Sequence, residues 1–591
     1  MTPLEQLEVL CRNTISRLFG EGCVSSISLQ RTSADFTGDF TLVVFPFLKF
    51  SKLKPEETAS LIGNELLKST DIILDFNVIK GFLNIRLQPE VWTKALIALK
   101  SDPTRVPTPP VKETILLEYS SPNTNKPLHL GHIRNILLGH SVSEILKKCK
   151  QTVIRVNLVN DRGIHICKSM LAWKKWGNGE TPESSGLKGD HLVGKYYVLF
   201  DKNLKAEIKG LINKGFSEEE AEKQAPLMKE AQAMLREWEA GEKEVVNLWK
   251  TMNAWVYAGF DITYHDLGVG FEKTYFESEM YLLGKSTVSE GLEKGVFYRE
   301  KDGSVWIDLT QEGLDKKLLL RSDGTSVYIT QDIGTAIQRF RDFPETSKMI
   351  YTVGNEQDYH FKVLFVILSR LGYSWAGNCR HLSYGMVELP EGKMKSREGT
   401  VVDADDMISE MRKTAEEMTV ELGKSDLSDP QASKILFNRI GMGALKYFIL
   451  KVDPRKTMLF NPRESVDFNG NTGPFVQYSY ARIQSILEKS GQKDFSFGAS
   501  VSVLEPELQL LRRIFEYPDA VLTAGKNLDP SEVAKYVYEL AREFNSFYHE
   551  CPVLKETNSD LRNFRLTLSG VTGEIISDAM RLLGIECPGK M

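Results

Sequence analysis

The stretch from residue 114 to residue 146 constrains the fold of this 591-residue chain more than any other. The apolar run Thr114 to Tyr119 is typical of a buried strand, and after a polar loop apolar residues recur at helical spacing as far as Leu146. Pro127 suits the first position of that helix, because proline has no backbone N–H to leave unpaired there. The pattern therefore predicts a strand, a loop and a helix that Pro127 opens. Its first turn carries His129, Gly131 and His132.

That helix start has the properties of a phosphate site. The first turn of a helix offers unpaired N–H groups and the positive end of the helix dipole. His129 and His132 share one face of the turn, and Gly131 leaves room for a flat group to approach the backbone. A surface helix with two histidines is the plain alternative. Only further motifs, in order along the chain, can decide between these interpretations.

The next elements predict a parallel sheet. Thr152 to Leu158 is a second apolar strand, and Ile164 to Trp176 has helical periodicity. Strand, crossover helix and strand form a right-handed βαβ unit. Residues from about 178 to 262 then interrupt the pattern. They are rich in Lys and Glu and are predicted to be a helical insertion whose charges form a solvated face.

The α/β pattern resumes after the insertion. Strands are predicted at Val305–Leu309 and Met349–Val353. Between them, Asp323-Gly324 is a strong turn signal, which predicts a hairpin of strands 318–321 and 327–330. Helices are expected from near Asp332 and over 362–371.

The two ends of the chain differ in pattern from its centre. Residues 1 to about 105 read as a small α+β unit, and the Pro-rich stretch 101–110 as a linker. After about 430 the pattern is helical. About three domains are expected at this length.

Composition sets further limits. A net charge of −5 excludes a molecule that is basic overall, although a local basic face remains compatible with it. The seven cysteines are scattered without a CxxC pair, which argues against a zinc knuckle or a disulfide framework and suits a reducing cytosol. The first residues do not resemble a signal peptide, and no apolar run is long enough to cross a membrane. A cytoplasmic location is therefore expected.

The sequence EYSSPNTNKPLHLGHIRN (118–135) resembles the HIGH signature of class I aminoacyl-tRNA synthetases, in the version of the arginyl-tRNA synthetases. The resemblance covers nearly the whole chain. It implies a Rossmann-like parallel-sheet catalytic domain at 111–425 with the helical insertion, an N-terminal α+β domain at 1–105 that contacts tRNA, and an all-helical anticodon-binding domain at 430–591. It also implies the reaction. ATP activates L-arginine to arginyl-adenylate, and the arginyl group passes to the 3′-terminal adenosine of tRNA(Arg), with release of AMP and pyrophosphate.

A second motif is the loop Lys393-Met394-Lys395-Ser396-Arg397, which resembles the KMSKS loop of that class. Ser396 stands where the class has its second lysine. Arginyl-tRNA synthetases often lack that lysine, and a lysine just before the HIGH motif is thought to substitute for it. Phosphoryl-type transfer needs positioning and positive charge more than covalent help. The catalytic residues implied are His129, His132, Lys126 and Lys393.

The third motif, GNEQDYH at 354–360, follows a strand, where open α/β sheets bind ligands. It resembles the GxDxxxH element of the class, with Glu356 in place of Asp. The ATP-binding set implied by the three motifs is Pro127, Leu130, Gly131, Gly354, Glu356, His360, Met386, Lys393, Met394, Lys395 and Ser396.

Arginine has a planar cation with five donors, which carboxylates and a tyrosine hold best. Glu277, Tyr328 and Asp332 match the family positions that bind the guanidinium. Tyr328 and Asp332 are expected across a strand-to-helix junction, where Asp332 could also cap the helix. Such a site should reject lysine without editing. Glu118 and Lys126 could pair nearby. Asn123 and Gln357 match positions that hold the amino acid's α-amino and carboxylate groups.

The tRNA candidates are at the two ends of the chain. PFVQYSYARI matches a family segment that meets the anticodon, and its aromatic and basic side chains suit base stacking and phosphate contact. The candidates are Phe475, Tyr478 and Arg482, with a core aromatic stripe as the alternative. GFLNIRL resembles part of the N-terminal module, which makes Asn84 a candidate RNA contact, with a turn or strand-edge asparagine as the alternative.

The partners implied are tRNA(Arg), L-arginine and ATP, with no membrane. Mg²⁺ is expected to arrive with ATP, held by phosphates and water and by no protein cage. A monomer is expected.

Two other functions fit part of the pattern. A nucleotidyl-transfer enzyme of the same fold without RNA would leave the helical C-terminal region unexplained. A non-catalytic synthetase-like RNA-binding protein would be favoured by loss of the HIGH histidines, and both are present. The acidic residues Asp403, Asp405 and Asp406 are expected to cap a helix from Met407 instead of holding a metal.

Overall fold

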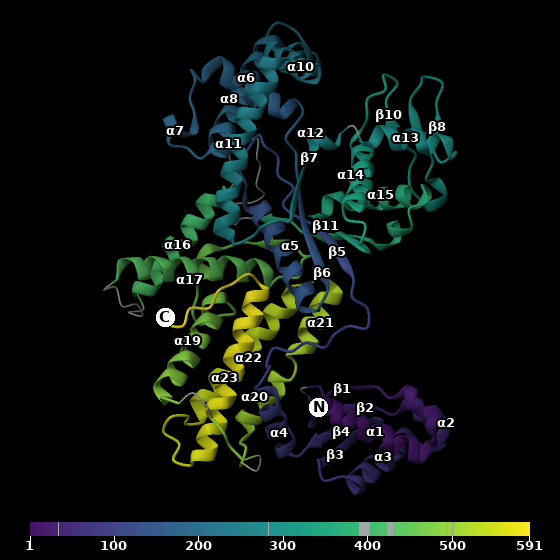
Figure 1. The fold of residues 1–591 in the computed structure, drawn as a ribbon, viewed down its shortest axis with the longest axis vertical. Helices are drawn as coiled ribbons and strands as arrows, with labels where there is room; N and C mark the ends of the chain where they lie inside the picture. Colours follow the sequence, from purple (N-terminus) through teal and green to yellow (C-terminus); the bar gives the residue numbers. More distant parts are fainter. Residues whose placement is uncertain (34, 282, 389–401, 422–428, 493–494, 499–500) are drawn as a thin grey trace.

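The computed structural model describes residues 1–33, 35–281, 283–388, 402–421, 429–492, 495–498 and 501–591 (Figure 1). The predicted loop at 393–397 lies outside these residues. In the described chain, no helix is both long enough and apolar enough to cross a membrane.

A parallel sheet of five strands organises the centre of the molecule, in the order β12-β11-β5-β6-β7. Its strands are β5 (Thr114–Glu118), β6 (Thr152–Val159), β7 (Lys273–Phe276), β11 (Lys348–Gly354) and β12 (Cys379–Tyr384). The strand order reverses between β5 and β11, and open α/β sheets bind ligands beyond the carboxyl ends at such a point. The predicted parallel sheet is confirmed. Strand β7, only four residues long, was not predicted.

Helix α5 (Leu130–Lys148) is the crossover between β5 and β6. It begins at Leu130 and not at Pro127 as predicted, because His129 is extended (φ −135°, ψ 172°) and caps the helix with its side chain. Both predicted histidines therefore still lie at the helix start, one as the cap and one in the first turn.

Two buried polar residues fasten α5 to the rest of the molecule. Arg134 is fully buried and donates to the carbonyls of Met386 (3.1 Å), Pro454 (3.1 Å) and Lys456 (2.7 Å). The next residue, Asn135, donates to the carbonyl of Thr352 in β11 (2.7 Å) and to the Tyr384 hydroxyl of β12 (3.1 Å), and accepts from the Ser120 amide after β5 (2.5 Å). The helix start is thus held against the switch point of the sheet.

The predicted hairpin at 318–330 is only half correct. Strand β10 (Lys317–Leu320) pairs with β9 (Val305–Ile307), but Val327 to Thr330 is not a strand. Helix α14 (Tyr328–Asp342) begins there, because its buried Ile329, Ile333 and Ile337 follow helical spacing. Asp332 is consequently inside the helix and does not cap it.

The segment between α6 (Ile164–Trp176) and β7 is helical, as predicted for the insertion. Helix α8 packs against α6 and α11, and α10 against α6, at the top of Figure 1. The helices are α7 (Pro182–Ser185), α8 (Gly189–Ile212), α9 (Glu218–Gln224), α10 (Pro226–Glu239) and α11 (Lys243–Leu267).

Short elements complete the central region. They are α12 (Glu277–Met280), α13 (Leu283–Glu293), β8 (Tyr298–Arg299), η3 (Thr310–Glu312), η4 (Asn355–Gln357), α15 (Asp358–Arg370), η5 (Ser374–Asn378), β13 (Val387–Glu388) and β14 (Met458–Leu459). The predicted helix at 362–371 is α15, which starts four residues earlier.

The N-terminal region is a four-stranded antiparallel sheet, ordered β1-β2-β4-β3, with helices around it. Arg512 of the C-terminal region donates to the buried carboxylate of Asp39 (2.5 Å), and Trp92 contacts Phe515 (5.8 Å between rings), so the two ends of the chain touch. The elements are α1 (Pro3–Phe19), η1 (Glu21–Ser26), β1 (Leu29–Arg31), β2 (Phe40–Val43), η2 (Phe45–Phe47), α2 (Leu48–Ser51), α3 (Pro55–Ser69), β3 (Ile73–Ile79), β4 (Phe82–Leu87) and α4 (Pro89–Leu99).

The C-terminal region is helical, as predicted. Helix α17 packs against α16, α19 and α5. The helices are α16 (Ala404–Glu421), α17 (Pro430–Leu450), α18 (Pro462–Ser465), α19 (Gly473–Ser490), α20 (Glu505–Ile514), α21 (Tyr517–Asn527), α22 (Ser531–Glu550) and α23 (Ser559–Leu582).

A buried ion pair joins β5 to α14. Glu118, the last residue of β5, pairs with Arg339, and not with Lys126 as suggested by the sequence. The side chains are 6% and 1% exposed, and the Arg339 guanidinium also lies over the rings of Tyr275 (5.3 Å) and Tyr351 (5.6 Å). The pair therefore fixes the first strand of the sheet to a helix that reaches the site.

We expect Glu118→Gln to lower the free energy of unfolding by about 3 kcal/mol, because it leaves the buried Arg339 charge uncompensated. Denaturant unfolding followed by tryptophan fluorescence measures the change. The matched control is Glu230→Gln, which breaks the half-exposed pair with Lys175 (2.8 Å) and should cost less than about 1 kcal/mol. Equal losses in the two variants would contradict this assignment.

Candidate active site at the switch point of the sheet

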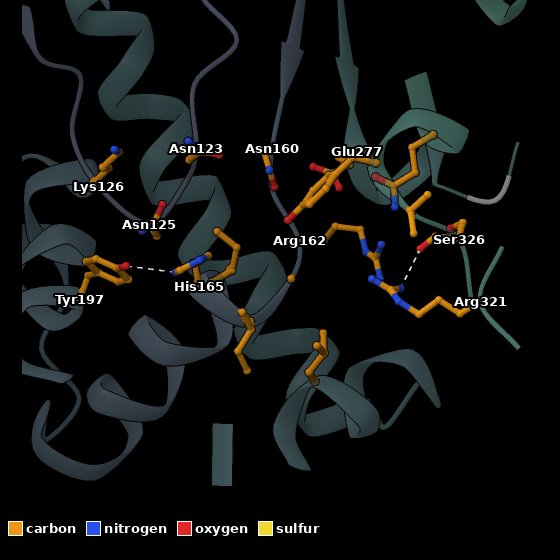
Figure 2. Close-up of a pocket in the computed structure, with 17 residues that line it drawn as sticks. Asn123, Asn125, Lys126, Asn160, Arg162, His165, Tyr197, Glu277, Arg321 and Ser326 are labelled. Atoms are coloured by element: carbon orange, nitrogen blue, oxygen red, sulfur yellow. Dashed lines mark hydrogen bonds between the residues drawn. The ribbon is translucent and has the colours of Figure 1, made fainter. Parts of the chain in front are cut away.

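A cavity of about 490 Å³ lies beyond the carboxyl ends of β5, β6 and β7 (Figure 2). Four of the predicted site residues line it: Asn123, Lys126, Glu277 and Tyr328. In Figure 2, Lys126 and Asn123 lie on one side and Glu277 on the other. The other lining residues are Asn125, Asn160, Arg162, Gly163, Ile164, His165, Ile166, Tyr197, Leu235, Arg321, Ser326, Val327 and Gln331.

The two histidines of the α5 start point their Nε2 atoms away from the backbone. The Gly131 amide donates to Nδ1 of His129 (3.1 Å), and the His129 amide donates to Nδ1 of His132 (3.1 Å). Since both Nδ1 atoms accept, a neutral ring carries its proton on Nε2 and can donate it to a ligand. The rings lie 3.9 Å apart between centroids.

Both imidazoles are neutral at physiological pH. Burial, helped by the nearby Lys126 ammonium, lowers the pKa of His129 to about 4. Burial lowers the pKa of His132 well below its ordinary value, and the His129 ring and Lys126 act in the same direction. Burial also lowers the pKa of Lys126 itself. The site therefore offers two neutral donors beside one ammonium.

The neighbours of these histidines are tightly packed. A Cβ on Gly131 would lie 3.0 Å from Cε1 of His129, so only glycine leaves that ring in place. The Leu130 side chain is fully buried, and its amide donates to the carbonyl of Val402 (3.1 Å). Pro127 touches α8, where a Cβ on Gly194 would meet its Cδ at 2.7 Å. The role predicted for Leu130 can therefore involve only its backbone.

The third motif follows β11, on the other side of the switch point. Gly354 ends the strand, and a Cβ there would lie 3.9 Å from the sulfur of Met386, so these two ATP candidates are neighbours. Glu356 and Gln357 are exposed in η4. Neither of them, nor Asp332, lines the cavity of Figure 2.

His360, an ATP candidate, and Asp332, an arginine candidate, are directly linked. Nε2 of His360 lies 2.6 Å from Oδ2 of Asp332. The two predicted subsites therefore meet at the start of α14 and α15.

Glu277 is the acidic group of the cavity. It is the first residue of α12, directly after β7. Burial raises the pKa of its carboxyl to about 7; the Arg162 guanidinium opposes this, while Asp332 and Asp161 add to it. When a carboxyl has a pKa near neutrality, a bound cation shifts it strongly towards its charged form.

Sequence reasoning missed Asp161 and Arg162, which follow β6. The buried Asp161 carboxylate accepts from the Ser278 amide (2.9 Å) and from the hydroxyls of Ser278 (2.7 Å) and Tyr257 (3.0 Å), and so holds α12 in place. The Arg162 guanidinium lies 4.0 Å over the Tyr281 ring. The position of NDRG (160–163) at a strand's carboxyl end, the argument used for 354–360, was the signal that could have identified them.

The acidic residues at 403–406 have different contacts. Asp403 caps α16, accepting from the amides of Asp405 (2.8 Å) and Asp406 (3.3 Å), so capping is correct although the helix begins at Ala404. Asp405 instead gathers with Asp190 and His191. The ammonium of Lys188 donates to Asp405, and so already neutralises charge there.

The predicted anticodon residues share one face of α19. Phe475 packs on Tyr538 of α22 (5.5 Å between centroids), and the Arg482 guanidinium lies over the rings of Tyr478 (5.0 Å) and Tyr548 (5.4 Å). The three predicted side chains are half-buried, and Tyr548 is exposed. They form one aromatic and basic surface.

Asn84 is placed differently from what a direct RNA contact requires. It lies in the central strand β4, is 2% exposed, accepts from Thr41 (2.6 Å) and donates to Asn77 (2.9 Å). The turn or edge position considered as the alternative is also wrong, since β4 is paired on both sides.

A parallel sheet with an HxGH turn at its switch point defines the catalytic domain of a class I aminoacyl-tRNA synthetase. The family model described as tRNA synthetases class I (R), catalytic domain, matches residues 96–461, and the DALR anticodon binding domain matches 476–591. Curated relatives named arginine–tRNA ligase include one from Parabacteroides distasonis, 55% identical over 98% of each chain, and one from Porphyromonas gingivalis, 52% identical over 100% of each. The chain belongs to the arginyl-tRNA synthetase family.

Solved structures share the fold. The arginyl-tRNA synthetase of Thermus thermophilus superposes with a TM-score of 0.80 at 24% identity, over 99% of this chain and 100% of that one. That of Plasmodium falciparum gives 0.76 at 20% identity, over 99% of both chains.

We expect His129 to titrate with a midpoint near pH 4 in the folded protein. The unfolded chain binds this proton near pH 6.5, so the His129 contribution to stability falls as the pH falls from 6.5 to 4. Histidine NMR signals, assigned with His129→Asn, measure the midpoint. His191, whose pKa is raised chiefly by its hydrogen bond to Asp405, supplies the internal contrast. A His129 midpoint near 6.5 would contradict the neutral donor pair.

Proposed function

We propose that the chain is an arginine–tRNA ligase that activates L-arginine with ATP and transfers the arginyl group to tRNA(Arg). The observation that carries this proposal is the position of Lys126. It lines the cavity that holds Glu277, and its charge acts on both imidazoles of the HxGH turn. The helix start that is proposed to bind phosphate and the cavity that contains the Glu277 carboxyl thus adjoin at one lysine. The printed names of the curated relatives support the same activity.

In the activation step, a carboxylate oxygen of arginine attacks the α-phosphorus of ATP. A P–O bond forms to the amino acid, and the bond to the β-phosphate bridge breaks to release pyrophosphate. Negative charge spreads over the phosphate oxygens. The Nε2–H groups of His129 and His132 and the ammonium of Lys126 would donate to those oxygens without covalent change. Lys393, in the loop outside the described residues, is proposed to assist.

In the transfer step, a hydroxyl of the terminal adenosine of tRNA attacks the arginyl carbonyl, and AMP leaves. Mg²⁺ enters with ATP, as part of the nucleotide substrate. Gly354, Met386, Glu356 and His360, around the end of β11, are the proposed nucleoside contacts.

The arginine side chain is proposed to bind Glu277, Tyr328 and Asp332. Glu277 lies half-buried at the cavity, and Tyr328 is 77% exposed beside it, free to cover a ligand. Asp332 is engaged by His360, so an entering guanidinium would exchange with or share that contact. Asn123 and Gln357 are the proposed contacts of the α-amino and carboxylate groups. A lysine substrate would leave part of this donor-matched site unpaired.

The anticodon arm is proposed to bind the α19 surface formed by Phe475, Tyr478 and Arg482, together with Tyr548. Because the Arg482 guanidinium lies over the rings of Tyr478 and Tyr548, this surface offers aromatic faces for base stacking and a positive charge for phosphate at one place. We propose the division into a tRNA-contacting domain (1–105), a catalytic domain (111–425) and an anticodon-binding domain (430–591). Asn84 stays a prediction that its burial does not support. The monomeric state and the cytoplasmic location also stay predictions.

Arginine-dependent ATP–pyrophosphate exchange tests the function, run with and without tRNA(Arg) and with lysine as the control substrate. We expect exchange with arginine and none with lysine. Exchange only when tRNA is present would add the dependence on tRNA seen in the family. No exchange with arginine under either condition, in a folded sample that binds ATP, would overturn the proposal in favour of a small-molecule or non-catalytic protein.

The raised pKa of Glu277 predicts how arginine binding depends on pH. A cation needs the carboxylate form, which is half populated at pH 7 and falls about tenfold per unit below it. We therefore expect the KM for arginine to rise about tenfold between pH 8 and pH 6, while the KM for ATP changes less. Exchange kinetics over that range measure both constants. In Glu277→Gln the pH dependence of the arginine KM should disappear; an unchanged dependence would assign it to another group.

A further inference from the structure

The segment 402–404 is paired with the HxGH turn. The Leu130 amide donates to the carbonyl of Val402 (3.1 Å), the Ala404 amide donates to the carbonyl of Leu128 (3.0 Å), and His129 faces Asp403 in an antiparallel bridge. The extended backbone that makes His129 a cap is therefore half of a two-strand bridge. Anything that holds 402–404 in place also holds His129.

The residue next to this bridge is anchored to the helical insertion. The Asp405 carboxylate accepts from Lys188 before α8, lies 2.8 Å from Nε2 of His191 on α8, and accepts from Thr263 of α11 (2.9 Å). Asp405 itself lies in the first turn of α16, so its side chain connects α16 with α8 and α11.

Further charges complete the cluster. Asp190, whose side chain is completely buried, lies 3.2 Å from the Lys188 ammonium, and Asp403 lies 3.5 Å from His191. A Cβ on Gly259 would meet Asp190 Oδ1 at 2.3 Å, which shows how closely α11 packs on this group. The cluster is thus built into the packing of the insertion, with the lysine ammonium among the carboxylates.

The same insertion touches the turn from its other side. Gly194, one turn beyond His191 on α8, packs against Pro127 just before the histidines. Helix α8 therefore meets the HxGH turn directly at Pro127 and indirectly through Asp405 and the 402–404 bridge. The insertion, whose charges were predicted to form a solvated face, therefore also packs against the backbone of the proposed nucleotide site.

We propose that Asp405 is a positioning residue for ATP, which together with Lys188, His191 and Thr263 holds the bridge that sets the backbone of His129. The inference rests on the proposed function, since it assumes that the HxGH turn binds the triphosphate. Asp405 touches no substrate. It acts through the bridge on the direction of the His129 ring.

This role differs from helix capping, which Asp403 performs with its own carboxylate. The proposed role of Asp405 also concerns ATP and not arginine. The arginine candidates Glu277 and Tyr328 are held by α12 and α14 and by the Asp161 contacts, which do not involve Asp405. Loss of the Asp405 contacts should therefore weaken ATP use and spare arginine recognition.

The test is Asp405→Asn in arginine-dependent ATP–pyrophosphate exchange, with tRNA(Arg) present and each substrate varied in turn. Removing a charged acceptor from several hydrogen bonds should raise the KM for ATP about tenfold. The KM for arginine should stay within about twofold. Thr263→Val, which removes one donor and keeps every charge, should give a smaller change in the same direction, and it provides the test if Asp405→Asn does not fold.

The matched control is Asp406→Asn, which removes the same charge one residue along, from an exposed side chain in the same first turn. It should leave both KM values unchanged. Lys188→Met should raise the KM for ATP, and combined with Asp405→Asn it should add little, because both remove one contact.

Wild-type activity separates this inference from the proposed function. With an active wild type, a fall in kcat with both KM values unchanged would mean only less folded enzyme, and would overturn the positioning role. Equal behaviour of Asp405→Asn and Asp406→Asn would overturn it as well.

Discussion

The structure depends on a buried guanidinium that main-chain carbonyls hold in place. Arg134 of α5 donates from its two terminal nitrogens to the main-chain carbonyls of Met386, Pro454 and Lys456. A cation buried in this way is costly unless those carbonyls stay in place, and burial lowers its pKa to about 10. The arrangement ties α5 to segments that follow β12 and α17. Since α5 begins at the HxGH turn, the contact that holds this helix also holds the proposed nucleotide site.

Around this helix, each strand end supplies a different chemical group. The loop after β5 and the first turn of α5 supply Lys126 and the neutral imidazoles. Strand β7 leads to Glu277, whose pKa lies near neutrality, and β11 leads to exposed polar groups near Gly354. Neutral donors suit a phosphate that must be bound and released, whereas a carboxyl that titrates near neutrality suits a cationic ligand. Both properties come from burial at the sheet edge, and the two side-chain types respond to it in opposite directions.

The helical insertion gives these groups a rigid support. The insertion interrupts the sheet in sequence, yet Asp161 of the sheet domain is bonded to it. The Asp161 carbonyl accepts hydrogen bonds from Trp249 (2.6 Å) and Asn253 (3.1 Å) of the insertion, and the Asp161 carboxylate accepts one from Ser278 of α12. The same insertion contacts 402–406 through Asp405. Its inner face is therefore structural for the site, while its outer face is charged and solvated as the composition indicated.

Local sequence determined much of this protein. The periodicity of 130–146 and 164–176, the apolar strands and the helical C-terminal region were predictable, because each depends on neighbours within one or two turns. The HxGH turn could be placed at a helix start for the same reason, although the helix begins at Leu130, with His129 as its cap, and not at Pro127. Val327 to Thr330 was predicted as a strand because a turn signal preceded it, and the burial of Ile329, Ile333 and Ile337 in one helical face outweighed that signal.

Tertiary structure alone decided which charged and polar groups meet. Glu118 pairs with Arg339 and not with Lys126, His360 binds Asp332, Asp405 turns to the insertion, and Asn84 is enclosed in its sheet. These partners are far apart in sequence. Their contact follows from the order of strands and the packing of helices, which no local pattern encodes. For the buried pair of Glu118 and Arg339, burial also raises the cost of an unpaired charge.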